Sequence, residues 1–457
     1  MIATAITRGL AGLSLVLRQP LPAFCEIETA HGDALVTRQC DYLSVVRIEG
    51  MRRMAKRDDV ERIATAQRID LAGALEDRGH AIVGWYVSDP DMAGVEIERL
   101  NLASCRTIAR ELGLNVSDVL EERAALWPRI MRWEAAYYVL WTRRAVLTKE
   151  ERRQMAEEQK VLSREGPRAG NSQRYYLRSE VMAARHTAFV SRVVASLGNN
   201  DVATRELDAH EALRVIRESV YRETAGSDWK ATLPGDRVMP RATEDPDGGE
   251  SPTAGMLWPA VAEQMFHADA ETLGGQRVRI GDHDYAPVDM AVGPEDPRPF
   301  VELSARLGQD RIPWRSAVVI EGGGRNAMQI KEVAATFFSM FPGNADIRRA
   351  FDALRQARNE DNHIGVRLRA SFATWAPAGE MRLLRRRAST LAQRIEGWGN
   401  CKTTPIAGDP LEGALSSVPG LSLTSTGTPQ IALLGDAFAM LPWNRTASPW
   451  EQGSVLF

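Results

Sequence analysis

Three short clusters in this 457-residue chain contain residue types that can do chemistry. The first is Gly322-Gly323-Gly324-Arg325, which follows an apolar run in the way a phosphate-binding loop does. Such a loop requires the pattern GxxxxGK[ST], because its lysine contacts the phosphates and its Ser/Thr hydroxyl binds Mg²⁺. Here Lys331 is followed by Glu332, and neither this pattern nor GxGxxG occurs in the chain. We therefore interpret the glycines as a flexible turn between a strand and a helix.

The second cluster, Asp282-His283-Asp284, offers side chains that bind metals. Alternating side chains of one short turn rarely converge on an ion without a second cluster, so we interpret it as a solvated turn. An enzyme with an unrecognised active site around Asp282 to Tyr285 stays open as an alternative. His210-Glu211 lacks the second histidine of a zinc-protease helix. His186 lies on the apolar stripe of a predicted helix, which indicates a hydrogen-bonded interior histidine.

The third cluster, Arg385-Arg386-Arg387, lies off the apolar stripe of its predicted helix. We favour a solvated helix face, with a docking surface for an acidic partner as the alternative. No nucleophile elbow and no paired-carboxylate motif occurs. The sequence therefore predicts no catalytic, cofactor-binding or metal-binding residue in this chain.

The composition is that of an ordinary globular protein, with 44% apolar and 26% charged residues. A net charge of −3 gives no general attraction to nucleic acid, so direct nucleic-acid binding is not expected. The four cysteines form no CxxC pair, which fits a reducing compartment and argues against disulfides and a zinc site. Near the N-terminus, the apolar run Gly9 to Leu17 is shorter than the about 20 residues that a membrane span needs. We interpret it as a short amphipathic helix that docks on protein or lies against a membrane surface.

The elements that would position these clusters form two α/β lobes. The first lobe, 1–147, alternates predicted strands and helices, as follows: strand or hairpin Asp33–Glu49, a helix from Asp58-Asp59 to Leu75, strand Ala81–Val87, helices Leu102–Leu112 and Asp118–Leu126, and strand Trp133–Thr142. A helical insertion, 148–223, follows, with helices expected at Lys149–Arg164, Ser179–Leu197 and Arg205–Glu223. Residues 224–256 are rich in glycine and proline and are expected to form a flexible linker.

The second lobe, 257–457, begins with the predicted strand Trp314–Ile320. The alternation in His363–Trp375 predicts an antiparallel strand with one solvent-facing side. Further elements are predicted by apolar periodicity, namely helices at Ile330–Phe341, Ile347–Ala357, Met381–Ile395 and Pro410–Ser416, and a segment at Ile431–Leu434. The fold class is thus α+β (mixed α/β), with mixed or antiparallel sheets in two lobes and a helical insertion between them.

The final stretch, Leu433 to Phe457, combines loop-forming residues with two tryptophans and ends in an apolar Val-Leu-Phe run. Its distinctive residues are Pro442, Trp443, Pro449, Trp450 and Gly453. This stretch resembles the junction between the N-terminal domain and the P-loop motor of type IV secretion and conjugation ATPases of the IcmB/DotO and TraU-like group. Weaker similarities to that family lie at Asp41–Gly50, Val139–Thr142, Ser371–Trp375, Gly408–Pro410 and Pro419–Leu421.

The resemblance implies an assembly and docking domain, truncated before the motor, of an ATPase that energises export at the cytoplasmic face of the bacterial inner membrane. It implies other secretion-system subunits as partners and a homo-oligomer, as a dimer or a hexamer-based assembly, in the full protein. ATP and Mg²⁺ are expected only for the missing motor domain, so this chain should be inactive alone. The five residues named above are then a structural junction, not an active site. A free-standing scaffold of the same secretion system without ATPase activity is the alternative.

Overall fold

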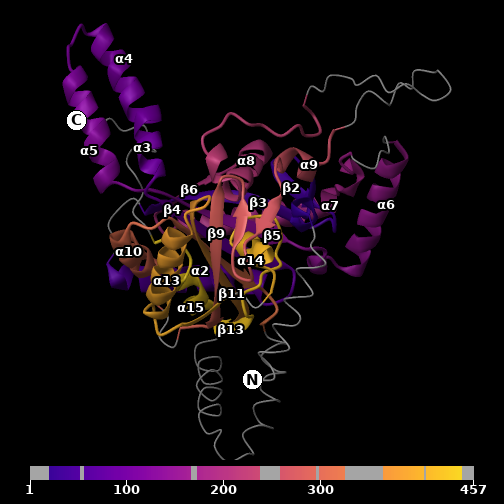
Figure 1. Ribbon diagram of the computed structural model, residues 1–457. Coiled ribbons are helices and arrows are strands. Elements are labelled where there is room, and N and C mark those ends of the chain that lie inside the picture. Colours follow the sequence, from indigo (N-terminus) through magenta and orange to yellow (C-terminus); the bar gives the residue numbers. More distant parts are fainter. Residues whose placement is uncertain are drawn as a thin grey trace, which may run out of the picture.

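The computed structural model describes residues 20–51, 56–165, 172–236, 258–294, 298–324, 364–405 and 408–444. The predicted α+β class is confirmed, because helices pack on a sheet of 13 strands (Figure 1). The strands are β1 (Ile27–His31), β2 (Ala34–Thr37), β3 (Tyr42–Met51), β4 (His80–Asp89), β5 (Trp133–Thr142), β6 (Val202–Glu206), β7 (Ala270–Thr272), β8 (Val278–Ile280), β9 (His283–Val292), β10 (Trp314–Glu321), β11 (Gly365–Pro377), β12 (Lys402–Pro405) and β13 (Gln430–Leu433).

The helices come from all parts of the described chain. They are α2 (Arg57–Leu75), α3 (Met92–Glu96), α4 (Ala103–Glu111), α5 (Ser117–Ile130), α6 (Lys149–Glu165), α7 (Glu180–Gly198), α8 (Ala209–Val220), α9 (Val261–Met265), α10 (Phe300–Asp310), α13 (Met381–Glu396), α14 (Pro410–Ser416) and α15 (Leu434–Ala439), with a π-helical segment, η2 (Ile97–Leu102), between α3 and α4. The predicted helices at Ile330–Phe341 and Ile347–Ala357 and the apolar run Gly9–Leu17 lie outside the described residues.

The strands of the two expected lobes belong to one sheet. Its order is β1-β2-β3-β5-β4-β10-β11-β9-β8-β7, with β6 beside β3, β12 beside β9 and β13 beside β11. The pairing of β4 with β10 joins the halves, running antiparallel from Ser88 opposite Trp314 to Ala81 opposite Glu321. Every strand pair in this order is antiparallel.

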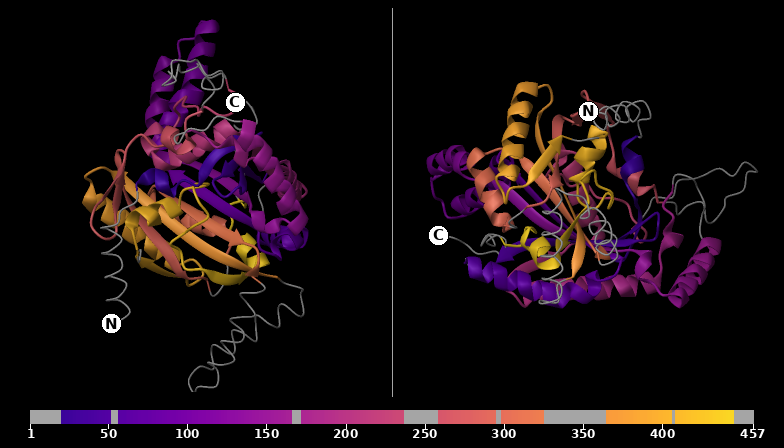
Figure 2. Two further views of the ribbon diagram at one scale, coloured as in Figure 1. Left: turned by 90° about the vertical axis from the view of Figure 1, so that its right-hand side faces the viewer. Right: turned by 90° about the horizontal axis from the view of Figure 1, so that it is seen from below.

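Helices cover both faces of the sheet, which explains why the central strands bury apolar side chains on both sides (Figure 2). In β4, Ile82 and Tyr86 point into a core shared with α2, α7, α10, α13 and α15. The intervening Val83 and Trp85 point into a second core, shared with α8, α9 and α14. A strand that is buried on both faces tends to be apolar on both, as β4 is.

The prediction of a solvent-facing side on β11 is therefore wrong. Only Arg367 and Arg369 are half-buried, whereas Ser371, Ala373 and Trp375 on the same side are buried. The reason is that α14 packs against β11 and β9 on that face. Alternation shows that the two faces of a strand differ in polarity, but it does not show that the more polar face is exposed. In β11 that face also carries small and aromatic residues, against which a helix can pack.

The predicted helix at Arg205–Glu223 is also wrong at its start, because Val202–Glu206 is strand β6, paired with β3. The helix begins at Ala209, where Asp208 caps it. The Glu211 N–H donates to Asp208 Oδ1 (2.8 Å), and the Asp208 N–H donates to Glu211 Oε2 (3.3 Å). This capping box fixes the boundary. By contrast, β5 and α14 have the predicted bounds.

Candidate protein interaction site

The segment between β4 and β5 forms a helical hairpin that projects from one end of the sheet (Figure 1). Its first arm contains α3, η2 and α4, and its second arm is α5. The arms share a small core of their own: Ile97, Leu102 and Leu120, with Cys105, Val116, Ala124 and Trp127 packed against it. The hairpin thus packs mainly against itself, and its outer surfaces are left to solvent.

Most of the large exposed hydrophobic side chains lie on this hairpin. Among the described residues eleven such side chains are exposed, and eight of them fall between 95 and 131. Their exposures range from 39% for Met131 to 66% for Leu112. Single exposed hydrophobic residues are ordinary, whereas a contiguous group marks an interaction surface.

Helix geometry places five of these side chains on one side of the hairpin. In α5, an exposed stripe is formed by Val119, Leu126 and Ile130. Val119 and Leu126 each come one residue before a member of the inner stripe, Leu120 and Trp127. In the first arm, Ile108 precedes Ala109, which with Cys105 is one of the two partly buried residues of α4, and Leu112 lies one turn after Ile108. One residue is a turn of about 100° in the same screw sense. In antiparallel helices both stripes therefore lie on the same side, called here the hairpin face: Ile108, Leu112, Val119, Leu126 and Ile130.

A buried ion pair anchors the base of the hairpin. The Arg222 guanidinium donates to Asp89 Oδ2 (3.0 Å), and both side chains are about 95% buried, at 4% and 5% exposure. The same guanidinium lies between the rings of Trp133 and Trp375, at 5.4 and 5.5 Å from their centroids. Asp89 ends β4 and Trp133 begins β5, so the two points at which the hairpin leaves the sheet are held together.

A second anchor lies beside the first. Arg387 donates to the Trp375 carbonyl (2.7 Å) and lies 3.9 Å from Asp91, which immediately precedes α3. Arg387 is thus turned inward, with its side chain at 13% exposure, whereas Arg385 and Arg386 are exposed. The prediction of a solvated face holds for those two arginines and is wrong for Arg387.

Of the predicted junction residues, the structure describes Pro442 and Trp443. Trp443 is fully buried in the main core, and its indole N–H donates to the Phe438 carbonyl (2.8 Å). Leu441 and Pro442 sit directly over Gly84 in β4, where an added Cβ would lie 2.6 Å from Leu441 Cδ2 and 2.8 Å from Pro442 Cδ. Pro449, Trp450 and Gly453 lie outside the described residues.

The Asp282–Tyr285 region is structural, and its interpretation as a solvated turn is wrong for Asp284. Asp284 is fully buried in β9, where its carboxylate accepts from Arg279 Nε (2.7 Å) and Nη2 (3.2 Å) and from the Gly379 N–H (2.8 Å). Tyr285 donates to the Val220 carbonyl (3.2 Å), and burial raises its pKa to about 12. Within the described part of the chain, no group of three His, Cys, Asp or Glu side chains could hold a metal ion.

The glycine cluster serves close packing of the backbone. A Cβ on Gly322 would lie 2.3 Å from the Asp77 carbonyl oxygen, and one on Gly324 would lie 2.2 Å from the Gly365 carbonyl oxygen. Gly323 has φ +83°, which favours glycine. Close backbone packing and a positive φ therefore explain the three glycines where β10 ends against α2 and β11, and a phosphate-binding role is not required to explain them.

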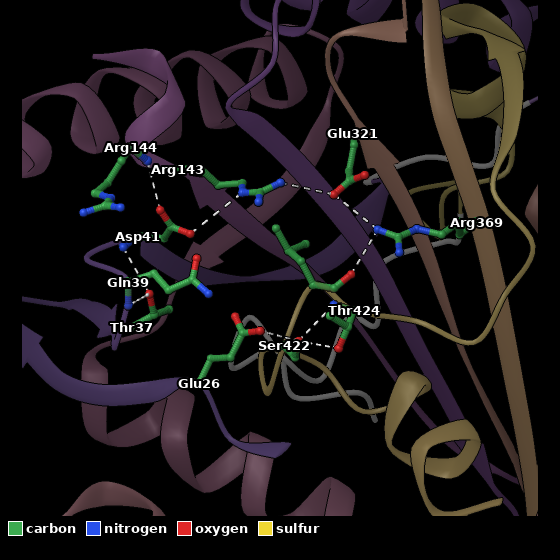
Figure 3. A network of polar contacts seen from close by, with 11 residues as sticks. Glu26, Thr37, Gln39, Asp41, Arg143, Arg144, Glu321, Arg369, Ser422 and Thr424 are labelled. Atoms are coloured by element: carbon green, nitrogen blue, oxygen red, sulfur yellow. Dashed lines mark hydrogen bonds and ion pairs between the residues drawn. The ribbon is translucent and has the colours of Figure 1, made fainter. Parts of the chain in front are cut away.

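At the end of the sheet opposite the hairpin, an ion-pair network ties strand ends together (Figure 3). Arg143 bridges Asp41 (3.8 Å) and Glu321 (3.7 Å), and Arg369 contacts Glu321 at 3.2 Å. Arg369 also donates to the Leu423 carbonyl (3.0 Å). Burial raises the pKa of Asp41, but each charge here has a partner. The network fastens the 422–424 loop to the strands and offers no unpaired catalytic group.

Two histidines beside this network are neutral and structural. His186 is buried between Ser44 Oγ (2.8 Å) and Thr142 Oγ1 (2.9 Å), as the prediction of a hydrogen-bonded interior histidine requires. Burial lowers its pKa to about 3. His80 stacks on Phe189 at 4.1 Å and helps to line a polar cavity of about 630 Å³ with Arg78, Arg185 and Arg192. Arg185 is paired there with Glu151 (2.7 Å).

The hairpin was not identified from the sequence as a site. Its helices were expected at Leu102–Leu112 and Asp118–Leu126, but no role was given to their apolar residues. The missed signal is that α5 carries two apolar stripes, Val119–Leu126–Ile130 beside Leu120–Ala124–Trp127, and a single partner helix can bury only one of them.

No helix in the described ranges has both the length and the apolar character that crossing a membrane requires. Comparison of the chain with protein-family models and with curated proteins found no match to either.

Proposed function

We propose that this chain is an assembly and docking domain of a type IV secretion or conjugative-transfer ATPase at the cytoplasmic face of the bacterial inner membrane. The observation that supports a docking role is the hairpin face, an apolar surface on an arm that projects from the sheet. Its side chains are 43% to 66% exposed. Burial of such apolar surface against another protein is favourable, with a transfer free energy of about 25 cal/mol for each Å² removed from water.

The anchoring of the hairpin supports a mechanical part in assembly. The Arg222–Asp89 pair and the two flanking tryptophans hold both strands at its base. Removing one partner of a buried pair costs about 3–5 kcal/mol, since it leaves the other charge uncompensated. A protein bound to the hairpin face is therefore coupled to β4 and β5 at the centre of the sheet.

The junction supports the second half of the proposal. Trp443 is held in the core, and Pro442 rests on Gly84 of β4, the strand that also leads into the hairpin. A motor domain joined beyond this point would be tethered to the sheet that carries the hairpin. Docking and motor movement would then be linked through one rigid body. The proposal that this motor is a secretion ATPase rests on the sequence resemblance of the final stretch.

The test uses the full-length protein in its bacterial host. Leu126→Ser with Ile130→Ser should reduce co-purification with inner-membrane secretion subunits and lower transfer at least tenfold, because the hairpin face loses its apolar centre. The matched control is Ile69→Ser with Val301→Ser, two isolated side chains exposed at 66% and 37% elsewhere. Both proteins should accumulate normally.

Transfer at the wild-type level with the hairpin variant, at equal protein abundance, would refute the docking role. The scaffold alternative is separated by the same strain. If the full-length protein that contains this chain hydrolyses no ATP while its hairpin is still required, the domain serves a free-standing scaffold.

A further inference from the structure

The geometry points to a specific occupant of the hairpin face: the same face of a second copy of this chain. The two hairpins would pair about a twofold axis and form an antiparallel four-helix bundle. This inference rests on the proposed function, in that it names the partner of the same surface.

The charges along α5 are divided in a way that suits self-pairing. Its first half holds Asp118, Glu121 and Glu122 with one basic residue, Arg123, and its second half holds only the basic Arg129; Arg132, just beyond the helix, is paired with Glu134 (3.4 Å). In a twofold contact, if residue i of one copy contacts residue j of the other, then residue j of the first copy also contacts residue i of the second. Antiparallel pairing of two α5 helices therefore sets the acidic half of each copy against the basic half of the other.

The register of these charges matches the apolar stripe. Glu122 and Arg129 are seven residues apart, so they lie on the same flank of the Val119–Leu126–Ile130 stripe. In an antiparallel pair this flank faces the same flank of the other helix. An axis beside Leu126 then places Leu126 against its own counterpart and Glu122 within one turn of Arg129 of the partner subunit. The axis generates this contact twice.

The overall charge of the hairpin argues against a lipid surface as the occupant. Between Met92 and Arg132 there are six acidic and six basic residues, so the hairpin carries no net charge. Helices that lie on anionic membranes place Lys and Arg beside the apolar stripe. Here that flank carries one acidic and one basic residue, Glu122 and Arg129, and not a row of cations, which suits a partner with the same two charges in the opposite order.

Sedimentation velocity of the purified 457-residue chain, over a wide concentration range, tests the inference. We expect a reversible dimer whose dissociation constant rises at least tenfold in Leu126→Ser with Ile130→Ser. The control pair Ile69→Ser with Val301→Ser should leave it unchanged. Circular dichroism spectra and melting temperatures of all variants establish that they are folded.

A charge exchange provides the sharper test, because it leaves the apolar residues in place. Glu122→Arg and Arg129→Glu should each weaken the dimer, and the double variant should restore it, since the twofold contact is then rebuilt with its signs reversed. Two single variants that weaken the dimer without recovery in the double variant would overturn the antiparallel register. A chain that stays monomeric at every concentration would overturn the inference altogether.

The outcomes separate this inference from the proposed function. A monomeric chain whose hairpin variants still lose the secretion subunits would mean that the hairpin docks on another protein, so the function stands and the inference fails. If the hairpin variants dissociate the dimer while transfer is unaffected, the inference stands and the proposed function fails.

Discussion

Replacement of Trp443 by alanine is the most direct test of how the junction is held. Trp443 is fully buried in the main core and donates its indole N–H to the Phe438 carbonyl at 2.8 Å. Truncation of a buried tryptophan to alanine costs about 3–5 kcal/mol, through lost transfer free energy and the remaining cavity. The free energy of unfolding should fall by about this amount.

Two further variants separate the contributions. Trp443→Phe keeps part of the buried ring and loses the hydrogen bond, which is worth about 0.5–1.5 kcal/mol, so its cost should be smaller than that of alanine. Trp229→Ala is the control, because that ring is only half-buried and lies under the Arg217 guanidinium, 4.8 Å away. It should cost less than Trp443→Ala.

The assay is urea unfolding followed by far-ultraviolet circular dichroism, since eleven tryptophans make fluorescence difficult to assign. The slope of the unfolding free energy against urea must stay unchanged for the midpoints to be compared. A cost below about 1 kcal/mol for Trp443→Ala would contradict a core role and with it the tethering of the junction to the sheet.

Two other predictions concern the sheet and its histidine. Gly84→Ala should destabilise the fold by about 1–3 kcal/mol, because its Cβ would collide with Leu441 and Pro442. The control is Gly73→Ala in α2, which has no atom within 4 Å of its added Cβ and should be neutral or stabilising by up to about 1 kcal/mol. Thermal unfolding of the two variants measures the difference. Because burial lowers the pKa of His186 to about 3 from 6.5, the unfolded state binds its proton more readily, so wild-type stability should fall as the pH drops from 6.5 towards 4. His186→Gln should remove about 1–2 kcal/mol of the loss between pH 7 and pH 5 in urea titrations, and equal losses in both proteins would contradict the assignment.

Local pattern predicted several elements well. The aromatic run Trp133–Thr142 and the helix Pro410–Ser416 have the expected bounds, since dense apolar residues and a proline after Asp409 specify them locally. The side-chain oxygen of Asp409 accepts from the Leu411 N–H at 2.9 Å, a contact within three residues of sequence. Such signals are complete in the sequence itself.

Contacts between distant residues were not predictable in the same way. Nothing near β4 indicates that its free edge pairs with β10, or that α14 covers the second side of β11. Asp284 illustrates the effect on a single residue. Its turn-like neighbours suggested solvent, but Arg279 and the Gly379 N–H satisfy it inside the protein.

The pairing of β4 with β10 has a consequence for how the chain is made. About 225 residues separate the end of β4 from the start of β10, so ribosomal synthesis at about 5–20 residues per second leaves that edge without its partner for roughly 11–45 s. During this time β4 and β5 can pair with each other, but an apolar edge in the middle of the future sheet remains open to other chains. Chaperone binding to the nascent chain should therefore begin after β5 emerges and persist at least until β10 leaves the ribosome. The emergence of β10, more than two thirds of the way along the chain, closes the edge of β4 and leaves the outer edge of β10 open until β11 pairs with it.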